Sequence, residues 1–268
     1  RAGELQVVQL SLLGSILSNT LLVLGFACVA AGVVKKNVTF DSSTSSANTT
    51  MLQVAVVGII MPTIMSTIGQ FHEHSATELA MSRFISAIFL VLYVLFLVNT
   101  MCPFPREQSK GGLEEAMEEA KAEGKRASQV AMDHDDEEEE AILDIWSAMA
   151  WLLGATVALA YLSELLSGAV EGAADSMGLT PAFVGFVIIP IIGNAAEHST
   201  AVVMAYRLKM DLALAVAQGS STQIALFVIP TMVMLGWAIG QPLDLQFGVF
   251  ESVTTWLCTV VVASVIND

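Results

Sequence analysis

The stretch FVIIPIIGNAAEHSTAVVMAY, residues 186–206, places polar side chains inside a run that is otherwise apolar. Pro190 cannot donate a backbone hydrogen bond, and Gly193 lowers helix propensity. We therefore predict a helix that loosens or breaks near Asn194. Backbone carbonyls freed at membrane depth are tolerated only where they line a cavity. The stretch thus predicts a broken helix that lines a cavity, and its polar side chains indicate the function of that cavity.

Three of these side chains can share one helix face, because Glu197 and His198 follow Asn194 by three and four residues. A carboxylate at the centre of a membrane helix costs about 2.5–3.5 kcal/mol on insertion scales. Packing does not explain that cost, so we interpret Glu197 as a functional residue. His198 has two interpretations: it relays protons, or it forms a hydrogen bond with a neighbouring backbone carbonyl.

The composition around this stretch is typical of a membrane protein. Hydrophobic residues make up 54% of the chain and charged residues 14%, against roughly 25% charged in soluble domains. A large soluble helical bundle is the alternative, but its helices rarely stay apolar on every face. Spans need about 20 residues, and we predict seven: Val7–Val34, Met51–Gly69, Leu79–Met101, Ile142–Ser167, Pro181–Tyr206, Leu212–Gly236 and Phe247–Ile266. Pro62 is expected to kink the second.

The charges are concentrated in one insert, residues 104–140, which holds thirteen acidic and five basic residues. Its Ala, Glu, Lys and Met content favours a helix, and a solvated linker is the alternative. If the seven segments alternate in direction, the insert and the loops 34–51 and 206–212 face the same side and carry nine of the eleven bases. The positive-inside rule then predicts that this side is cytosolic.

An internal repeat links the two ends of the chain. QLSLLGSILSNTLLVLG (9–25) aligns with AVAQGSSTQIALFVI (215–229) on their Gly-Ser pairs. The first copy begins on one side of the membrane and the second on the other, so the copies are inverted. Inverted repeats with polar residues at mid-depth are typical of secondary transporters, whose site lies between the repeats. The polar residues of the first copy, which form a pseudo-symmetric candidate site, are Ser15, Ser18 and Asn19.

The second copy supplies further oxygen donors, Ser220 and Gln223, one turn apart. Gln223 is treated as a buried amide that needs partners, and Gly219 as a point where helices approach closely. Together with Asn194 and Glu197, which we predict to be direct metal ligands, these groups suit a hard cation such as Ca²⁺. The three cysteines show no zinc-binding or disulfide spacing, and we expect no resident cofactor.

These motifs resemble the vacuolar-type cation/proton exchangers (CAX) of the Ca²⁺/cation antiporter superfamily. The resemblance rests on GNAAEH (193–198), KMDLALAVAQGSSTQIALFVIP (209–230) and SLLGSILSNTLLVLG (11–25). It implies an α-helical inverted-repeat antiporter fold that exports cytosolic Ca²⁺, and often Mn²⁺, into an acidic compartment in exchange for H⁺. By the motif match, Glu197 would be the cation- and proton-binding carboxylate, with Asn194, Ser220 and Gln223 beside it.

The resemblance also implies an organisation. Residues 1–103 would belong to the N-terminal transmembrane half, 104–140 to a cytosolic acidic helix, and 141–268 to the C-terminal half. The family's second Gly-Asn-x-x-Glu motif is expected before Arg1, and its last helices after Asp268. We expect a vacuolar or other acidic-organelle membrane, Ca²⁺, H⁺ and lipid as partners, no nucleic acid and no enzymatic activity. A homo-oligomer is left open, and the alternative functions are a Na⁺-coupled Ca²⁺ exchanger and a cation channel.

Overall fold

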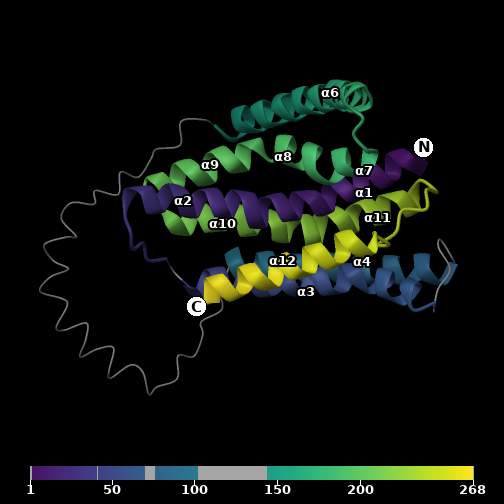
Figure 1. Ribbon diagram of the computed structural model, residues 1–268, viewed down its shortest axis with the longest axis horizontal. Coiled ribbons are helices and arrows are strands. Elements are labelled where there is room, and N and C mark those ends of the chain that lie inside the picture. The colour runs from purple at the N-terminus through teal and green to yellow at the C-terminus, as the bar shows by residue number, and fades with distance from the viewer. Residues whose placement is uncertain (1, 41, 70–75, 102–143, 268) are drawn as a thin grey trace, which may run out of the picture. The chain divides into compact units, whose positions relative to one another are not determined.

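The computed structural model describes residues 2–40, 42–69, 76–101 and 144–267, and every regular element in these ranges is helical (Figure 1). The predicted all-α class is therefore confirmed. The acidic insert, with the helix predicted in it, lies outside the described residues. The chain forms two compact units, one of Arg1–Leu97 with Gly168–Asp268 and the other of Val98–Ser167.

The seven predicted segments are all long and apolar enough, by length and composition, to cross a membrane. Six are single spans: Gln6–Val34, Ser45–Thr67, Ala76–Thr100, Ile145–Leu165, Met210–Ala238 and Val249–Ile266. The seventh is a bent pair, Pro181–Gly193 with Ala195–Tyr206, at an angle of 51°. Helix α3 (Ser42–Thr67) begins earlier than predicted, and Pro62 lies inside it without ending it.

Each copy of the repeat forms one long rod in which a π-helical turn joins two α-helices. The first rod is α1 (Ala2–Leu17), η1 (Ser18–Val23) and α2 (Leu24–Val34). The second is α10 (Met210–Gln223), η3 (Ile224–Val228) and α11 (Ile229–Ala238). The junction residues keep helical angles, as at Leu17 with φ −64° and ψ −44°. Because π-turns recur at functional sites, the centres of both rods are candidate positions for such a site.

The bent segment breaks where the sequence predicts. It consists of α7 (Pro181–Phe183), η2 (Val184–Ile188), α8 (Ile189–Gly193) and α9 (Ala195–Tyr206). Asn194, between α8 and α9, leaves helical geometry with φ −94° and ψ 17°. The predicted break near Asn194 is confirmed.

Prolines account for two of the three π-turns. Pro190 is the second residue of α8 and Pro230 the second of α11, and each follows a π-turn directly. A proline has no N–H to donate to the carbonyl four residues earlier, and its ring crowds that carbonyl. Widening the preceding turn relieves the crowding. For Pro190, the carbonyl left without a helical partner is that of Phe186.

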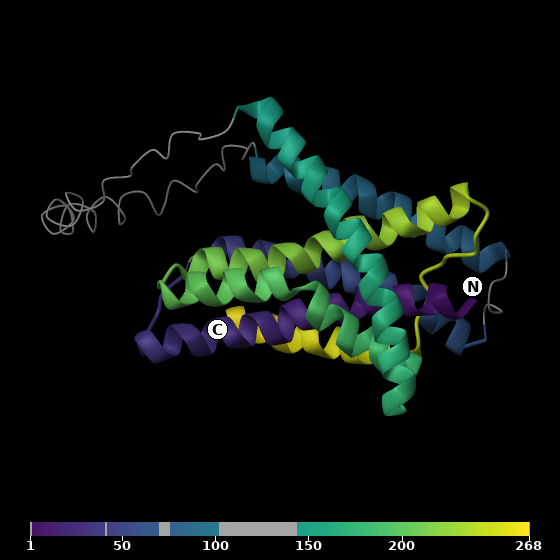
Figure 2. The same ribbon diagram turned by 90° about the horizontal axis from the view of Figure 1, so that it is seen from above.

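The two copies of the repeat run in opposite directions within the first unit (Figures 1 and 2). Helix α1 contacts η3, the later part of the second rod, whereas α2 contacts α10, its earlier part. The bent segment instead runs parallel to the first rod, because α1 contacts η2 and α8 while α2 contacts α9. Helices α3 and α12 (Val249–Asn267) contact each other, and α3 also contacts α10. The inverted arrangement predicted from the repeat is thus present.

The core of the first unit consists of two apolar clusters. The first apolar cluster contains Leu13, Ile16, Leu52, Ala55, Val56, Ile59, Ile60, Phe89, Ala225, Leu226, Ile229, Val233, Leu245 and Phe247. The second apolar cluster contains Val23, Leu24, Ala27, Ala31, Ala201, Ala205, Met210, Ala213, Leu214, Ala217, Val262 and Ile266. Both rods pass from one cluster to the other, and what lies between the clusters defines the candidate site.

The second unit contains the end of α4 (Ala76–Met101) and most of α6 (Ile145–Met177) among its described residues. None of the most apolar window within Ile145–Leu165 is buried. Trp146 and Trp151 are 75% and 71% exposed. An apolar helix exposed on all sides is typical of a lipid-facing span.

Candidate cation site

A buried polar layer separates the two apolar clusters. We define the layer by eleven buried side chains: Ser18, Asn19, Thr20, Ser45, Thr49, Asn194, Gln218, Ser221, Thr222, Thr255 and Thr259. On the first rod these residues fall between Ile16 and Val23, and on the second between Ala217 and Ala225. Buried polar groups need partners, so a layer of this kind in an apolar core indicates a binding function.

The close approach of α1 to the bent segment depends on Gly14. A Cβ atom added at Gly14 would overlap the carbonyl oxygen of Phe186 and lie 2.5 Å from Cγ of Pro190. The Phe186 carbonyl, released by Pro190, is therefore turned toward the glycine of the repeat. The contact brings Asn194 within reach of α1, where its Nδ2 donates to the carbonyl oxygen of Ser15 at 3.2 Å.

A second hydrogen bond joins the two copies of the repeat. Asn19 Nδ2 donates to Ser220 Oγ at 2.9 Å. This bond fixes the orientation of the Asn19 amide and turns its oxygen away from Ser220. Asn19 Oδ1 and the neighbouring Ser18 Oγ are both buried without a hydrogen-bond partner. Two oriented oxygen acceptors inside an apolar core are the ligands that a hard cation prefers.

Glu197 lies in the first turn of α9, directly after the break, and its side chain is partly buried. The positive end of the helix dipole favours a carboxylate there. His198 Nδ1 lies 2.7 Å from the carbonyl oxygen of Asn194. A carbonyl oxygen only accepts, so Nδ1 carries the proton in the neutral ring and Nε2 is the acceptor. Nε2 is buried without a partner, and the proton-relay role stays a prediction.

Two expectations for the second copy are corrected by the structure. Gln223 was treated as a buried amide, but its side chain is exposed, because that side of α10 is turned away from the packed core. A Cβ atom at Gly219 would meet nothing within 4 Å, so helices do not approach closely there. The role of Gln223 as a ligand stays a prediction, while Ser220 contacts the first copy directly.

Sequence reasoning missed several buried polar side chains, of which Gln218 and Glu78 are the largest. Gln218 is 1% exposed, but only its neighbours Gly219, Ser220 and Gln223 were named from the sequence. Glu78, in the first turn of α4, is 0% exposed and accepts a hydrogen bond of 2.9 Å from the Gln246 amide, oriented with its nitrogen toward the carboxylate. A signal was present, since Ser82 and Ser86 repeat at four-residue spacing after Glu78 and both are fully buried.

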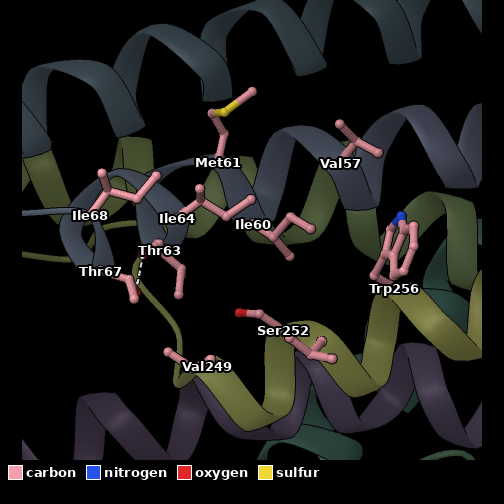
Figure 3. Close-up of a pocket in the computed structure, with 11 residues that line it drawn as sticks. Val57, Ile60, Met61, Thr63, Ile64, Thr67, Ile68, Val249, Ser252 and Trp256 are labelled. Atoms are coloured by element: carbon pink, nitrogen blue, oxygen red, sulfur yellow. Dashed lines mark hydrogen bonds between the residues drawn. The ribbon is translucent and has the colours of Figure 1, made fainter. Parts of the chain in front are cut away.

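A cavity elsewhere in the first unit has the wrong chemistry for a cation. Figure 3 shows a pocket between α3 and α12 whose walls include Ile60, Ile64, Val249 and Trp256. Its volume is about 430 Å³. Few oxygen atoms line it, among them the Ser252 hydroxyl. Within the described residues no group of three or more His, Cys, Asp or Glu side chains could hold a metal ion. The polar layer supplies amide and hydroxyl oxygens, and Glu197 follows its member Asn194 by three residues. The layer together with Glu197 is therefore the candidate cation site.

The interface between the copies gives a first prediction. Ser220→Ala removes the acceptor of the Asn19 amide and leaves a buried N–H unpaired, which costs about 1–3 kcal/mol. We expect a lower midpoint of thermal unfolding, measured on the purified full-length protein in detergent. Adding Asn19→Leu should recover part of the loss, because the unpaired amide is then gone. Additive losses in the double variant would contradict the pairing.

The fold and the layer define a class of protein: an α-helical membrane protein with inverted repeats that meet at buried polar groups. Comparison with known proteins agrees, because the sodium/calcium exchanger protein family matches residues 1–101 and 147–268. The chain belongs to this family.

Individual relatives support the same assignment. The chain is 41% identical to vacuolar cation/proton exchanger 3 of Oryza sativa subsp. japonica, covering 99% of this chain and 61% of the relative. It is 38% identical to the Ca²⁺/H⁺ antiporter of Synechocystis sp., covering 100% and 70%. Among solved structures, native YfkE aligns with a TM-score of 0.74 and 29% identity over 100% of this chain and 69% of that one. The chain spans about three-fifths of the length of the plant relatives it matches.

Proposed function

We propose that this chain forms the cation-handling part of an antiporter that moves Ca²⁺, with Mn²⁺ as an alternative cargo, out of the cytosol in exchange for H⁺. The observation that carries the proposal is the pair of hydrogen bonds that meet at the polar layer. Asn19 to Ser220 joins the two copies of the repeat, and Asn194 to Ser15 attaches the broken helix to them. Glu197 follows the break directly. The names of the rice and cyanobacterial relatives support the cargo and the counter-ion.

The mechanism follows from competition at Glu197. With the site open to a low-pH compartment, the carboxylate takes a proton and releases the metal. With the site open to the cytosol, it loses the proton and binds the metal through its oxygens and those of the layer. In both states the charge is compensated, so no bare carboxylate is carried through hydrocarbon. The resemblance implies a second carboxylate as its partner, and two protons would then balance one Ca²⁺.

The break at Asn194 supplies the mobile element for alternating access. Helix α9 is joined to α8 through one residue outside helical geometry, so α9 can tilt about that residue. At the break, Asn194 Nδ2 donates to the Ser15 carbonyl oxygen and the ring centroids of Phe26 and His198 lie 6.2 Å apart, while α9 itself packs on α2 and α10 through largely apolar side chains. Few polar contacts need to change when the site opens from one side to the other.

We propose that the end of the first unit where α2 and α9 finish faces the cytosol. Because α2 and α9 contact each other and run in parallel, Val34 and Tyr206 lie at the same end. Lys35, Lys36, Arg207 and Lys209 follow these ends, which agrees with the positive-inside rule. An acidic-organelle membrane, such as that of a vacuole, would supply the proton gradient.

The test is ion uptake by the full-length protein in vesicles. With an acidic interior and neutral exterior, we expect external Ca²⁺ to enter against its gradient while a trapped pH dye reports loss of internal protons. A proton ionophore should stop both, and an outward Na⁺ gradient without a pH gradient should drive no uptake. Uptake that follows Na⁺ instead would indicate the sodium-coupled exchanger. Uptake without proton movement would indicate a channel.

A further inference from the structure

The side-chain amide of Gln218 is buried in the core of the first unit in an unusual way. Its side chain is 1% exposed, and among the residues that the structure describes neither Nε2 nor Oε1 has a hydrogen-bond partner. Both polar atoms of the amide have lost their hydrogen bonds to water without gaining a protein partner, and this lowers the free energy of unfolding. A buried polar group left unpaired requires an explanation, and a ligand or ion that the group serves is one of the few available.

The place of Gln218 on α10 shows which neighbour it faces. Thr222, one turn later on the same helix face, donates through Oγ1 to the carbonyl oxygen of Asn48 on α3 at 3.3 Å. On the same rod, Leu214 belongs to the second apolar cluster and Ala225 to the first. Gln218 therefore lies in the polar layer, on the side of α10 that packs on α3.

The contact between α3 and α10 is polar at one end and apolar at the other. Toward the start of both helices it contains buried polar side chains, Ser45 and Thr49 on α3 and Gln218 on α10. Toward their other end Leu52 and Val56 of α3 share the first apolar cluster with Ala225. On α3 the buried polar side chains of the layer thus reach Ser45, near the start of the helix, whereas on α10 the residues before Gln218, such as Leu214, belong to the second apolar cluster.

The internal repeat provides a comparison for this position. With Gly14-Ser15 aligned on Gly219-Ser220, Gln218 corresponds to Leu13. Leu13 is 0% exposed and lies in the first apolar cluster. The same place in the first copy is filled by an apolar side chain, so packing alone does not require an amide. The amide is a feature of the α3 and α10 side only.

We propose that Gln218 is a second cation-binding position, on the α3 and α10 side of the polar layer, at which the transported divalent ion is held with its water on its way to or from the end where these helices begin. The amide oxygen is a hard donor that ligates such an ion, and the amide nitrogen donates to its water. Leu13, at the equivalent place in the first copy of the repeat, has no polar atom in its side chain, so the first copy offers no corresponding cation-binding position. The identity of the ion rests on the proposed function, whereas access of water and small cations to Gln218 does not.

Thiol accessibility tests that access directly. In the full-length protein with Cys28, Cys102 and Cys258 replaced by Ala, we would compare Gln218→Cys with Leu13→Cys, two fully buried positions related by the repeat. The probe is Ag⁺, a small cation that binds thiolates, and the readout is the thiol left for maleimide after denaturation. We expect Ag⁺ to block Cys at 218 at least about tenfold faster than at 13, a difference of about 1.4 kcal/mol in barrier height.

Equal protection of the two thiols would overturn the proposal. If Ag⁺ blocks Cys at 218 quickly but the unmodified protein moves no Ca²⁺ in vesicles, the antiport function fails while access of small cations to this position stands. Failure of the two ideas is thus distinguishable.

A substitution that copies the first repeat gives an independent readout. Gln218→Leu is expected to raise or maintain the midpoint of thermal unfolding, because the unpaired amide is removed. It should also lower the rate of Ca²⁺ uptake about tenfold, mainly through weaker apparent Ca²⁺ affinity from the α3 and α10 end, and Gln218→Asn should restore part of it. Leu214→Met, one turn away in the second apolar cluster, serves as the control with unchanged uptake. Unchanged uptake in Gln218→Leu would show that the amide is not on the path.

Discussion

Replacing Glu197 by Gln is expected to abolish proton-driven Ca²⁺ uptake by the full-length protein in vesicles. The amide keeps the shape of the side chain but can neither release a proton nor supply a negative charge. Removing one partner of a buried charge pair costs roughly 2–5 kcal/mol, so Ca²⁺ binding should weaken by at least about 30-fold. Exchange should fall further, because the group that alternates between proton and metal is gone.

The variant must remain folded for this result to be informative. Glu197 is partly buried at the first turn of α9, and a neutral amide is easier to hold there than a charge, so thermal unfolding should not be lowered. Glu164→Gln is the matched control, because Glu164 is an exposed acid on α6, and its uptake should equal that of the unmodified protein. Full uptake by the Glu197→Gln protein would exclude the proposed exchange mechanism.

Replacing Gly14 by Ala is expected to separate α1 from the broken helix. The new methyl group would overlap the Phe186 carbonyl oxygen and press on Pro190, 2.5 Å away. Neither atom belongs to a flexible chain end, so the helices themselves must move. Overpacking of this kind costs about 1–3 kcal/mol, and the hydrogen bond from Asn194 to Ser15 should be lost with it. We expect a lower midpoint of thermal unfolding and uptake reduced in proportion to the displacement of Asn194.

The second copy of the repeat supplies the control for Gly14. Gly219→Ala changes the same residue at the equivalent place, but the new methyl group would meet nothing within 4 Å. Alanine is also a better helix former than glycine by about 1 kcal/mol. The Gly219→Ala protein should therefore unfold at the same temperature as the unmodified protein or a higher one. Equal losses at the two positions would contradict the role assigned to the close contact at Gly14.

Much of the architecture could be predicted because its causes act over short distances along the chain. Runs of about 20 apolar residues mark spans whatever their neighbours are. The break at Asn194 follows from Pro190 and Gly193, which act through the backbone within one turn. The repeat of Gly-Ser pairs indicated an inverted pair of rods, and the contacts of α1 with η3 and α2 with α10 agree.

The candidate site was predicted in part. Asn19, Asn194 and Ser220 were named from their types and positions, and the structure brings Asn19 to Ser220 and Asn194 to the backbone of Ser15. Gln223 was named as a buried amide one turn from Ser220, and Gln218 was not named. The structure reverses their burial, with Gln218 at 1% exposure and Gln223 exposed. Both residues stand in the same apolar run, and nothing within that run distinguishes them.

The sequence by itself determined which segments are helices that can span a membrane, where one of them breaks, and that two of them repeat in opposite directions. Hydropathy, proline and glycine fix these features through a few neighbouring residues. Only the tertiary structure decided which side of each rod is buried. A helix that is apolar on every face carries no pattern to mark its inner side. The neighbouring helices determine which side is buried. Gly14 therefore lies at a close helix contact, a Cβ atom at Gly219 would meet nothing within 4 Å, and Gln218 is buried.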